Sequence, residues 1–195
     1  MTAPATELWL IRHGPTHARA MIGWTDLPAD LSDTAALARL AGRLPLAPVV
    51  SSDLVRAIST ADAVQGARPR LANESALREM YFGAWEGRTH AEAEAQNPAL
   101  ARALWEKPGD TAPPGGESWN DFAARCCTAI DGLIAVQGPG PLIIVAHFGV
   151  ILSQVQRARG ISAVEAFAQP IANLSLTRIA HDAGGWTVRE VNALP

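Results

Sequence analysis

The feature that most constrains this chain is a short apolar run that ends in an arginine, a histidine and a glycine. Residues 8–11 are continuously apolar, as expected of a strand that is buried on both faces of an α/β sheet. Arg12, His13 and Gly14 follow directly. Because ligands of α/β proteins bind in the crevice beyond the carboxyl ends of the strands, we expect Arg12 and His13 to line such a crevice.

A second strand pattern ends in nearly the same way. Residues 141–146 are mainly apolar, and His147, Phe148 and Gly149 come next. A single histidine after a strand is more often a hydrogen-bonded structural residue than a catalytic one, but two histidines behind two buried strands indicate a shared site. The amide N–H groups of Phe148 and Gly149, at the start of the helix that follows, are expected to add donors for an anion.

Strand and helix patterns alternate along the chain. This alternation predicts an α/β fold, a three-layer α/β/α sandwich around a mainly parallel sheet with an antiparallel edge. The irregular stretch 15–30 is expected to pass over the crevice. The predicted strands are 8–11, 48–52, 68–71, 141–146, 174–179 and 186–191, and the predicted helices are 32–44, 53–65, 89–105, 117–137 and 150–159.

Length and composition narrow the possible functions. We expect one domain over residues 1–195, with a candidate lid at about 81–116. The net charge of −3 provides no basic face for nucleic acid.

There is neither a signal sequence nor a run of the roughly 18 apolar residues that a membrane span needs, so a cytoplasmic protein without a membrane partner is expected. The two cysteines, Cys126 and Cys127, are adjacent and are interpreted as small apolar residues of a helix. The oligomeric state is left open.

Phosphoryl transfer is the chemistry that these residues fit. The transferred group carries charge on three equatorial oxygens, so its site needs fixed donors, an in-line nucleophile and an acid for the leaving oxygen. Arg12 and Arg56 each present a planar fork of donors. Arg56 follows the predicted strand 48–52, which places it at the same sheet edge as His13. The alternative for Arg56 is a surface ion pair with Asp53, three residues earlier.

Glu79 is the candidate acid. It lies in an otherwise apolar and aromatic segment, where partial burial would raise the pKa of its carboxyl group and suit it to donate a proton near neutral pH. The same group would later accept a proton from water. Glu86 is the competing acid, but it precedes Gly87 in a predicted turn and is expected to be structural.

Four motifs in this order resemble the signature of the histidine phosphatase superfamily, the phosphoglycerate mutase-like proteins. They are Arg12-His13-Gly14 with Thr16, the segment 52–57 with Arg56, the segment 77–87 with Glu79, and the segment 115–118 followed by the strand that ends at His147. By this resemblance, His13 is the nucleophile that forms a phosphohistidine, and Glu79 is the general acid and base. Arg12, Arg56 and His147 would form the phosphate pocket. The resemblance also implies a phosphoglycerate mutase-like fold and neither a metal nor an organic cofactor.

Two positions depart from the family pattern. Many members carry an asparagine shortly after the first motif that helps to bind phosphate, whereas this chain has His17, Ala18 and Arg19. Arg19 either replaces that donor or faces solvent. Phe148 stands where small residues are common, and its ring either narrows the site, stacks on a substrate or makes a core contact. Thr16, Arg19 and Phe148 are therefore the candidate substrate-binding residues.

The compact size and the segment 79–83 are similar to the phosphatases of the family rather than to its mutases, which are typically longer. The expected function is a metal-independent phosphomonoesterase for a small-molecule phosphate ester. The α-ribazole phosphatases share the size and the motifs, so α-ribazole 5′-phosphate is a candidate substrate beside sugar and carboxylic acid phosphates.

The alternatives to this function are a mutase-type phosphotransferase, a phospho-ligand binding module with little turnover, and a metallohydrolase. The last would use His13, His17 and His147, but no carboxylate stands at a recognised ligand spacing among them.

Overall fold

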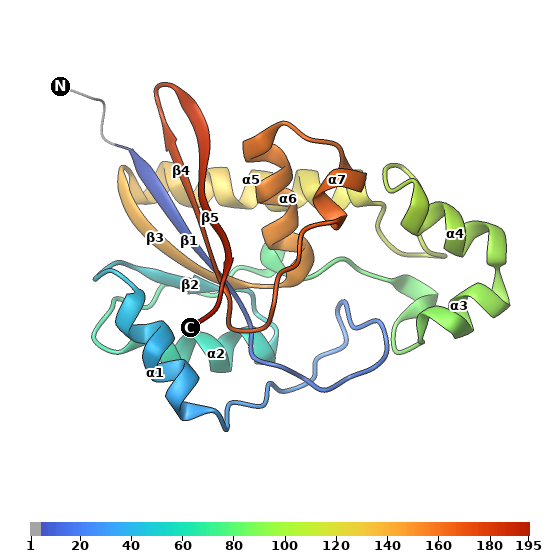
Figure 1. Ribbon diagram of the computed structural model, residues 1–195, viewed down its shortest axis with the longest axis horizontal. Helices are drawn as coiled ribbons and strands as arrows, with labels where there is room; N and C mark the ends of the chain where they lie inside the picture. The colour runs from blue at the N-terminus through green and yellow to red at the C-terminus, as the bar shows by residue number, and fades with distance from the viewer. Residues whose placement is uncertain (1–4) are drawn as a thin grey trace.

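A mixed sheet of five strands forms the centre of the fold. The computed structural model describes residues 5–195, and the strand order is β2-β3-β1-β4-β5 (Figure 1). β3 runs parallel to β2 and β1, whereas β4 runs antiparallel to β1 and β5. The predicted sheet, mainly parallel with an antiparallel edge, is therefore confirmed. The strands are β1 (Thr6–Arg12), β2 (Val49–Ser51), β3 (Gly140–Ala146), β4 (Leu176–Asp182) and β5 (Gly185–Ala193).

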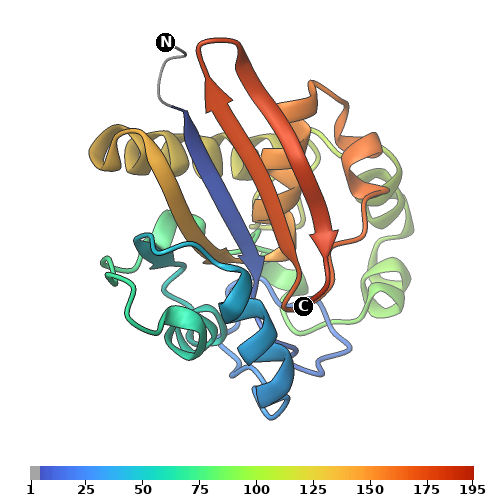
Figure 2. The same cartoon turned by 60° about the vertical axis from the view of Figure 1, so that its left-hand side comes forward.

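Helices cover both faces of the sheet, which confirms the predicted three-layer sandwich (Figures 1 and 2). The side chains of β1 alternate between the two faces. Leu8 and Leu10 pack into the core beneath α5 and α6, whereas Ile11 packs into the core beneath α1 and α2. Burial of this apolar surface holds both helical layers on the sheet. The four helices are α1 (Thr34–Arg43), α2 (Val55–Gln65), α5 (Trp119–Gln137) and α6 (Phe148–Arg159).

The single helix predicted over 89–105 is wrong, because the chain breaks at Asn97. Pro98 has no N–H to donate, and it disfavours a helical backbone at the residue before it. Asn97 therefore ends α3 (His90–Gln96), and its side chain accepts from Leu100 N at 3.1 Å at the start of α4 (Pro98–Glu106). The two helices project beyond the end of the sheet (Figure 1). They belong to the segment 81–116, whose role as a lid stays a prediction.

Three short helices were not predicted from the sequence. Two of them, η1 (Ser75–Leu77) and η2 (Gly83–Trp85), lie on either side of Glu79 in the chain. The third, α7 (Ala163–Phe167), begins with a capping box in which Ser162 and Glu165 each bind the backbone N–H of the other. Within residues 5–195, no helix combines the length and the apolar character that a membrane span requires.

The predicted strand 68–71 is also wrong. Its only ladder contact within the described chain is an isolated bridge between Arg70 and Val49. Pro69 cannot donate to a ladder, and the Arg68 guanidinium instead binds carbonyl groups at and just beyond the C-terminal ends of two helices, where few intrahelical donors remain. Its acceptors are the carbonyl oxygens of Ala41, Leu44, Pro45, Val64 and Gln65, at 2.6–3.2 Å.

We predict that Arg68→Ala lowers the free energy of unfolding by about 2–4 kcal/mol, because it leaves several carbonyl groups without their charged donor. The site described below lies at the other end of the strands, so activity per folded molecule should not change. Urea unfolding followed by circular dichroism measures the effect, with Arg39→Ala, an exposed position of α1, as the control. Equal stability of the two variants would show that the Arg68 contacts contribute nothing.

Candidate active site

The parallel pairing of β1 with β3 brings the two predicted histidines together. Arg12 is in register with Ala146, so His13 and His147 follow at adjacent strand ends. The amide N–H of His13 donates to the carbonyl oxygen of Ala146 at 3.0 Å. The ring centroids of the two histidines are 5.1 Å apart. The predicted meeting of both histidines at one sheet edge is confirmed.

His13 has a defined tautomer. Its Nδ1 lies 2.7 Å from the carbonyl oxygen of Gly14, and a carbonyl oxygen can only accept, so the ring proton is on Nδ1 and Nε2 keeps its lone pair. Burial, together with the smaller effects of the charges of Arg56 and Arg12, lowers the pKa of His13 to about 3 despite the opposing Gly14 bond. Near neutral pH the ring is therefore uncharged, which leaves Nε2 available as a nucleophile.

Arg56 is buried beside the loop that crosses the crevice. Its guanidinium is covered, with 1% of the residue exposed, and it donates to the carbonyl oxygens of Thr25 at 2.8 Å and Gly23 at 2.7 Å. The alternative surface pair with Asp53 is wrong, because Asp53 accepts two hydrogen bonds from Arg78, at 2.6 and 2.7 Å. Arg56 thus fixes the loop and keeps further N–H groups for a ligand.

A small polar cavity unites most of the predicted site residues. Its volume is about 140 Å³. We call it the polar cavity. The Arg12 side chain lines this cavity. Its Nη1 donates to the Ile171 carbonyl oxygen at 2.5 Å. Its buried Nε has no hydrogen-bond partner among the described residues. The lining residues are Arg12, His13, Thr16, Ala18, Ala20, Ile22, Arg56 and Glu79.

Three predicted residues, His147, Arg19 and Phe148, do not line the polar cavity, and Phe148 belongs to the larger cavity described below. His147 is fully buried next to His13, and within residues 5–195 neither of its ring nitrogens has a hydrogen-bond partner. Burial holds the pKa of His147 well below its usual value, and the neighbouring His13 and arginines lower it further. Arg19 is exposed, which matches the alternative in which this side chain faces solvent.

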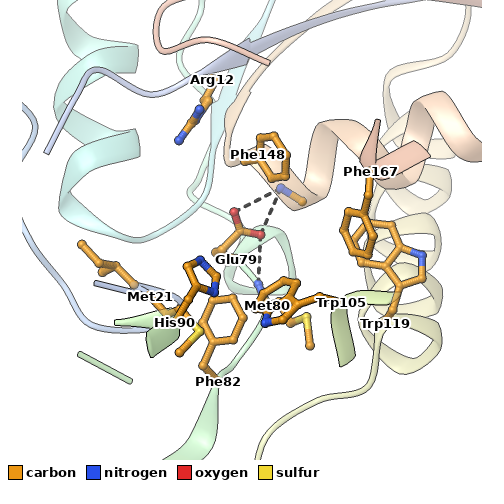
Figure 3. Close-up of a pocket in the computed structure, with 12 residues that line it drawn as sticks. Arg12, Met21, Glu79, Met80, Phe82, His90, Trp105, Trp119, Phe148 and Phe167 are labelled. Atoms are coloured by element: carbon orange, nitrogen blue, oxygen red, sulfur yellow. Dashed lines mark hydrogen bonds between the residues drawn. The ribbon is translucent and has the colours of Figure 1, made fainter. Parts of the chain in front are cut away.

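Glu79 is held by the helix that follows His147. Its carboxylate accepts from Gly149 N, at 3.1 and 3.2 Å to its two oxygens, and from Met80 N at 3.0 Å (Figure 3). Burial nevertheless raises the pKa of this carboxyl group, as predicted. The expectation that Gly149 N–H would serve an anion is wrong, because Glu79 occupies it. A Cβ on residue 149 would lie 2.4 Å from Glu79 Oε1, so this position requires glycine.

Further residues support the site, and the sequence analysis missed two of them. Arg125 binds Glu117 through two hydrogen bonds of 2.7 and 2.8 Å and donates to the carbonyl oxygen of Arg78 at 3.1 Å, which fixes the segment before Glu79. Asn173 donates to the carbonyl oxygen of His13 at 2.8 Å. The bonds from Arg125 to Arg78 and from Asn173 to His13 join parts of the chain far apart in sequence, so no local pattern predicts them. Glu86 is structural, as predicted, since it accepts the backbone N–H groups of Gly23, Trp24, Thr25 and Phe82.

A larger cavity adjoins the polar one, and we call it the aromatic cavity. Its volume is about 280 Å³. Arg12, Ile22 and Glu79 line both cavities. Phe148 lines this one, with its ring centroid 5.4 Å from the Arg12 guanidinium. The other lining residues are Met21, Met80, Phe82, His90, Trp105, Trp119, Gly149 and Phe167 (Figure 3).

Of the three histidines considered as metal ligands, His17 does not join His13 and His147. His17 is exposed and its Nε2 lies 2.8 Å from a carboxylate oxygen of Asp30. Among residues 5–195, no group of three or more histidine, cysteine, aspartate or glutamate side chains is arranged to hold a metal ion.

Comparison with known proteins identifies the family. A glucosyl-3-phosphoglycerate phosphatase of Mycolicibacterium vanbaalenii is 38% identical over 74% of this chain and 70% of its own length. A phosphoglycerate mutase-like protein of Arabidopsis thaliana is 31% identical over 78% of this chain and 71% of its own length. The crystal structure of the α-ribazole phosphatase of Shigella flexneri, 26% identical, matches with a TM-score of 0.83 over 97% of this chain and 98% of that one. Because the sequence pattern of the family matches residues 8–194, the chain belongs to the histidine phosphatase superfamily (branch 1).

Proposed function

We propose that this protein is a phosphatase that hydrolyses a phosphate monoester of a small molecule through a phosphohistidine on His13, without a metal ion. One observation carries the proposal. The polar cavity combines a neutral His13, whose Nδ1 proton is bound by Gly14, with two guanidinium groups and the buried carboxyl group of Glu79. A nucleophile, positive charge and an acid are the parts that phosphoryl transfer needs.

In the first step, His13 Nε2 attacks phosphorus and the bond between phosphorus and the ester oxygen breaks. Glu79 gives its proton to the leaving oxygen, so that an alcohol departs rather than an alkoxide. In the second step, water attacks the phosphohistidine, and the Glu79 carboxylate accepts a proton from that water. Inorganic phosphate leaves, His13 is again neutral, and Glu79 is again protonated.

The arginines supply the positive charge that the transition state needs. Arg12 and Arg56 lie in the lining of the polar cavity and are assigned to the equatorial oxygens of the phosphoryl group. His147 is assigned as a further donor, because it is buried beside His13 with both ring nitrogens unpartnered in the described structure. The Thr16 hydroxyl is assigned to the substrate. A role for Arg19 would require its exposed side chain to turn inward.

The product of the second step depends on whether water reaches the phosphohistidine. The relative at 38% identity is named a phosphatase, whereas the relative at 31% identity is named only mutase-like, and this supports hydrolysis over a mutase reaction. We assign α3 and α4, within segment 81–116, as a lid over the leaving-group side of the site. Phosphate release from a substrate with no acceptor present separates a phosphatase from a mutase and from a binding module.

Glu79→Gln should separate acid catalysis from nucleophilic attack. In excess chelator, we expect kcat/KM for an alkyl phosphate to fall by about 10²–10⁴, because the leaving alkoxide needs a proton. The loss for p-nitrophenyl phosphate should be clearly smaller, since its leaving group is stable without one. kcat/KM is the suitable quantity because it excludes the later hydrolysis of the phosphohistidine.

His13→Ala is the matched control in the same assay, and it should abolish turnover of both substrates. Equal losses for both substrates in Glu79→Gln would remove the acid assignment. Full activity of His13→Ala would remove the whole mechanism, and loss of wild-type activity in chelator would reinstate a metal-dependent one.

The pH profile follows from two opposite pKa shifts. Activity of the free enzyme needs His13 without a proton and Glu79 with one. The acid limb of kcat/KM should lie near pH 3, the pKa of His13. The alkaline limb should lie above the ordinary glutamate value of about 4.3, because burial raises the pKa of Glu79, and the rate falls as that proton is lost.

The profile is measured with an alkyl phosphate, over the pH range in which circular dichroism shows an intact fold. In Glu79→Gln, the limb assigned to Glu79 should disappear, while the acid limb of His13 and the ionisation of the substrate remain, and titration of the substrate alone gives the position of the latter. An identical alkaline limb in the wild type and in Glu79→Gln would show that another group titrates there.

A further inference from the structure

The aromatic cavity lies where the rest of a bound substrate must extend. Glu79 lines the polar and the aromatic cavity, so the ester oxygen that it protonates would sit at their boundary. With the phosphoryl group in the polar cavity, the alcohol portion can extend into the aromatic one. We propose, on the basis of the function proposed above, that the enzyme prefers monoesters of uncharged, ring-containing alcohols over those of sugars or carboxylated alcohols.

The walls of this cavity are made of rings from separate elements. Trp105 of α4 has its ring centroid 6.4 Å from that of Phe82 and 6.5 Å from that of Phe167 in α7. Trp119 of α5 packs against Phe167 at 4.6 Å. Figure 3 shows these rings arranged around Glu79. Flat apolar surfaces of this kind bind a ring by burial and by offset or edge contacts.

Few polar groups remain free to recognise hydroxyl groups. The indole N–H of Trp119 donates to the Gln156 side chain at 2.7 Å, so it is not available to a ligand. Gly149 N–H is used by Glu79. His90, an exposed residue, is the only other titratable side chain of the lining besides Arg12 and Glu79. A sugar in this cavity would lose hydrogen bonds to water and regain few.

A carboxylated alcohol is disfavoured for a second reason. Arg12 is the one guanidinium of this lining, and the mechanism commits it to the phosphoryl group. A carboxylate in the cavity would lie near Glu79 and would find no permanent cation there, since the remaining basic side chain is the exposed His90, and burying an unpaired charge is costly. The phosphatase relative is named for glucosyl-3-phosphoglycerate, so the expected preference separates this chain from that relative.

The volume limits the size of the ring system. A cavity of about 150 Å³ is enough for benzene in another protein. The aromatic cavity, at about 280 Å³, therefore has room for one ring with a short linker, or for two fused rings.

Three phosphate esters of alkyl alcohols test the preference. They are benzyl phosphate, which carries a ring, glycerol 3-phosphate, which carries hydroxyl groups, and 3-phosphoglycerate, which carries a carboxylate. We expect kcat/KM for benzyl phosphate to exceed both others by roughly tenfold to hundredfold, the effect of burying one ring. Phosphate release is measured for each with the full chain.

Variants of the lining connect the preference to this cavity. Trp105→Ala should lower the ratio of kcat/KM for benzyl phosphate to kcat/KM for glycerol 3-phosphate by about tenfold. Leu100→Ala is the matched control, since Leu100 is an apolar residue of the same helix that is not part of the lining. If Trp105→Ala does not fold, Phe167→Leu tests the opposite wall.

The outcomes are distinct. A benzyl preference that Trp105→Ala removes and Leu100→Ala keeps supports the inference. The inference is overturned if the enzyme hydrolyses all three esters without preferring benzyl phosphate, or if Trp105→Ala keeps that preference. In either case, turnover that depends on His13 leaves the proposed function intact. No turnover of any ester overturns the proposed function, and the inference with it.

Discussion

The parallel pairing of β1 with β3 is the constraint on which the site depends. Because Arg12 and Ala146 are in register, the chain delivers His13 and His147 to the same edge, where their rings lie 5.1 Å apart. The apolar strands are buried beneath helices on both faces, so a slip of one residue would turn every core side chain to the wrong layer. The packing that stabilises the fold thereby also fixes the positions of the reacting groups.

The bond from Gly149 N–H to Glu79 joins this edge to the remainder of the site. It ties the start of α6 to the segment that contains Glu79. The Arg125–Glu117 pair fixes the same segment. Two opposing effects act on the carboxyl group. Burial favours its protonated form, while the two backbone donors favour the ionised form, and burial is the larger effect. An acid that exchanges a proton with an ester oxygen and then with water needs such a balance.

Those parts of the fold and the site that a local sequence pattern marks could be predicted from the sequence. The strand-end histidines follow from continuous apolar runs, and the burial of Glu79 follows from its apolar neighbours. The break at Asn97-Pro98 and the capping box before α7 follow from local rules as well, so the sequence alone is sufficient to predict them. Asn173 and Phe167 were not readable, because what places them is long-range packing. The aromatic cavity is therefore a property of the assembled fold.

In the proposed mechanism, His13 carries the phosphoryl group during turnover. Glu79→Gln with p-nitrophenyl phosphate is the most direct test, since the good leaving group departs without an acid while the hydrolysis of the intermediate lacks its base. After an alkaline quench, which preserves phosphohistidine, mass spectrometry should find one phosphoryl group on the peptide that contains His13. Continued release of p-nitrophenol with no phosphorylated peptide, or with the phosphoryl group on another residue, would contradict the account.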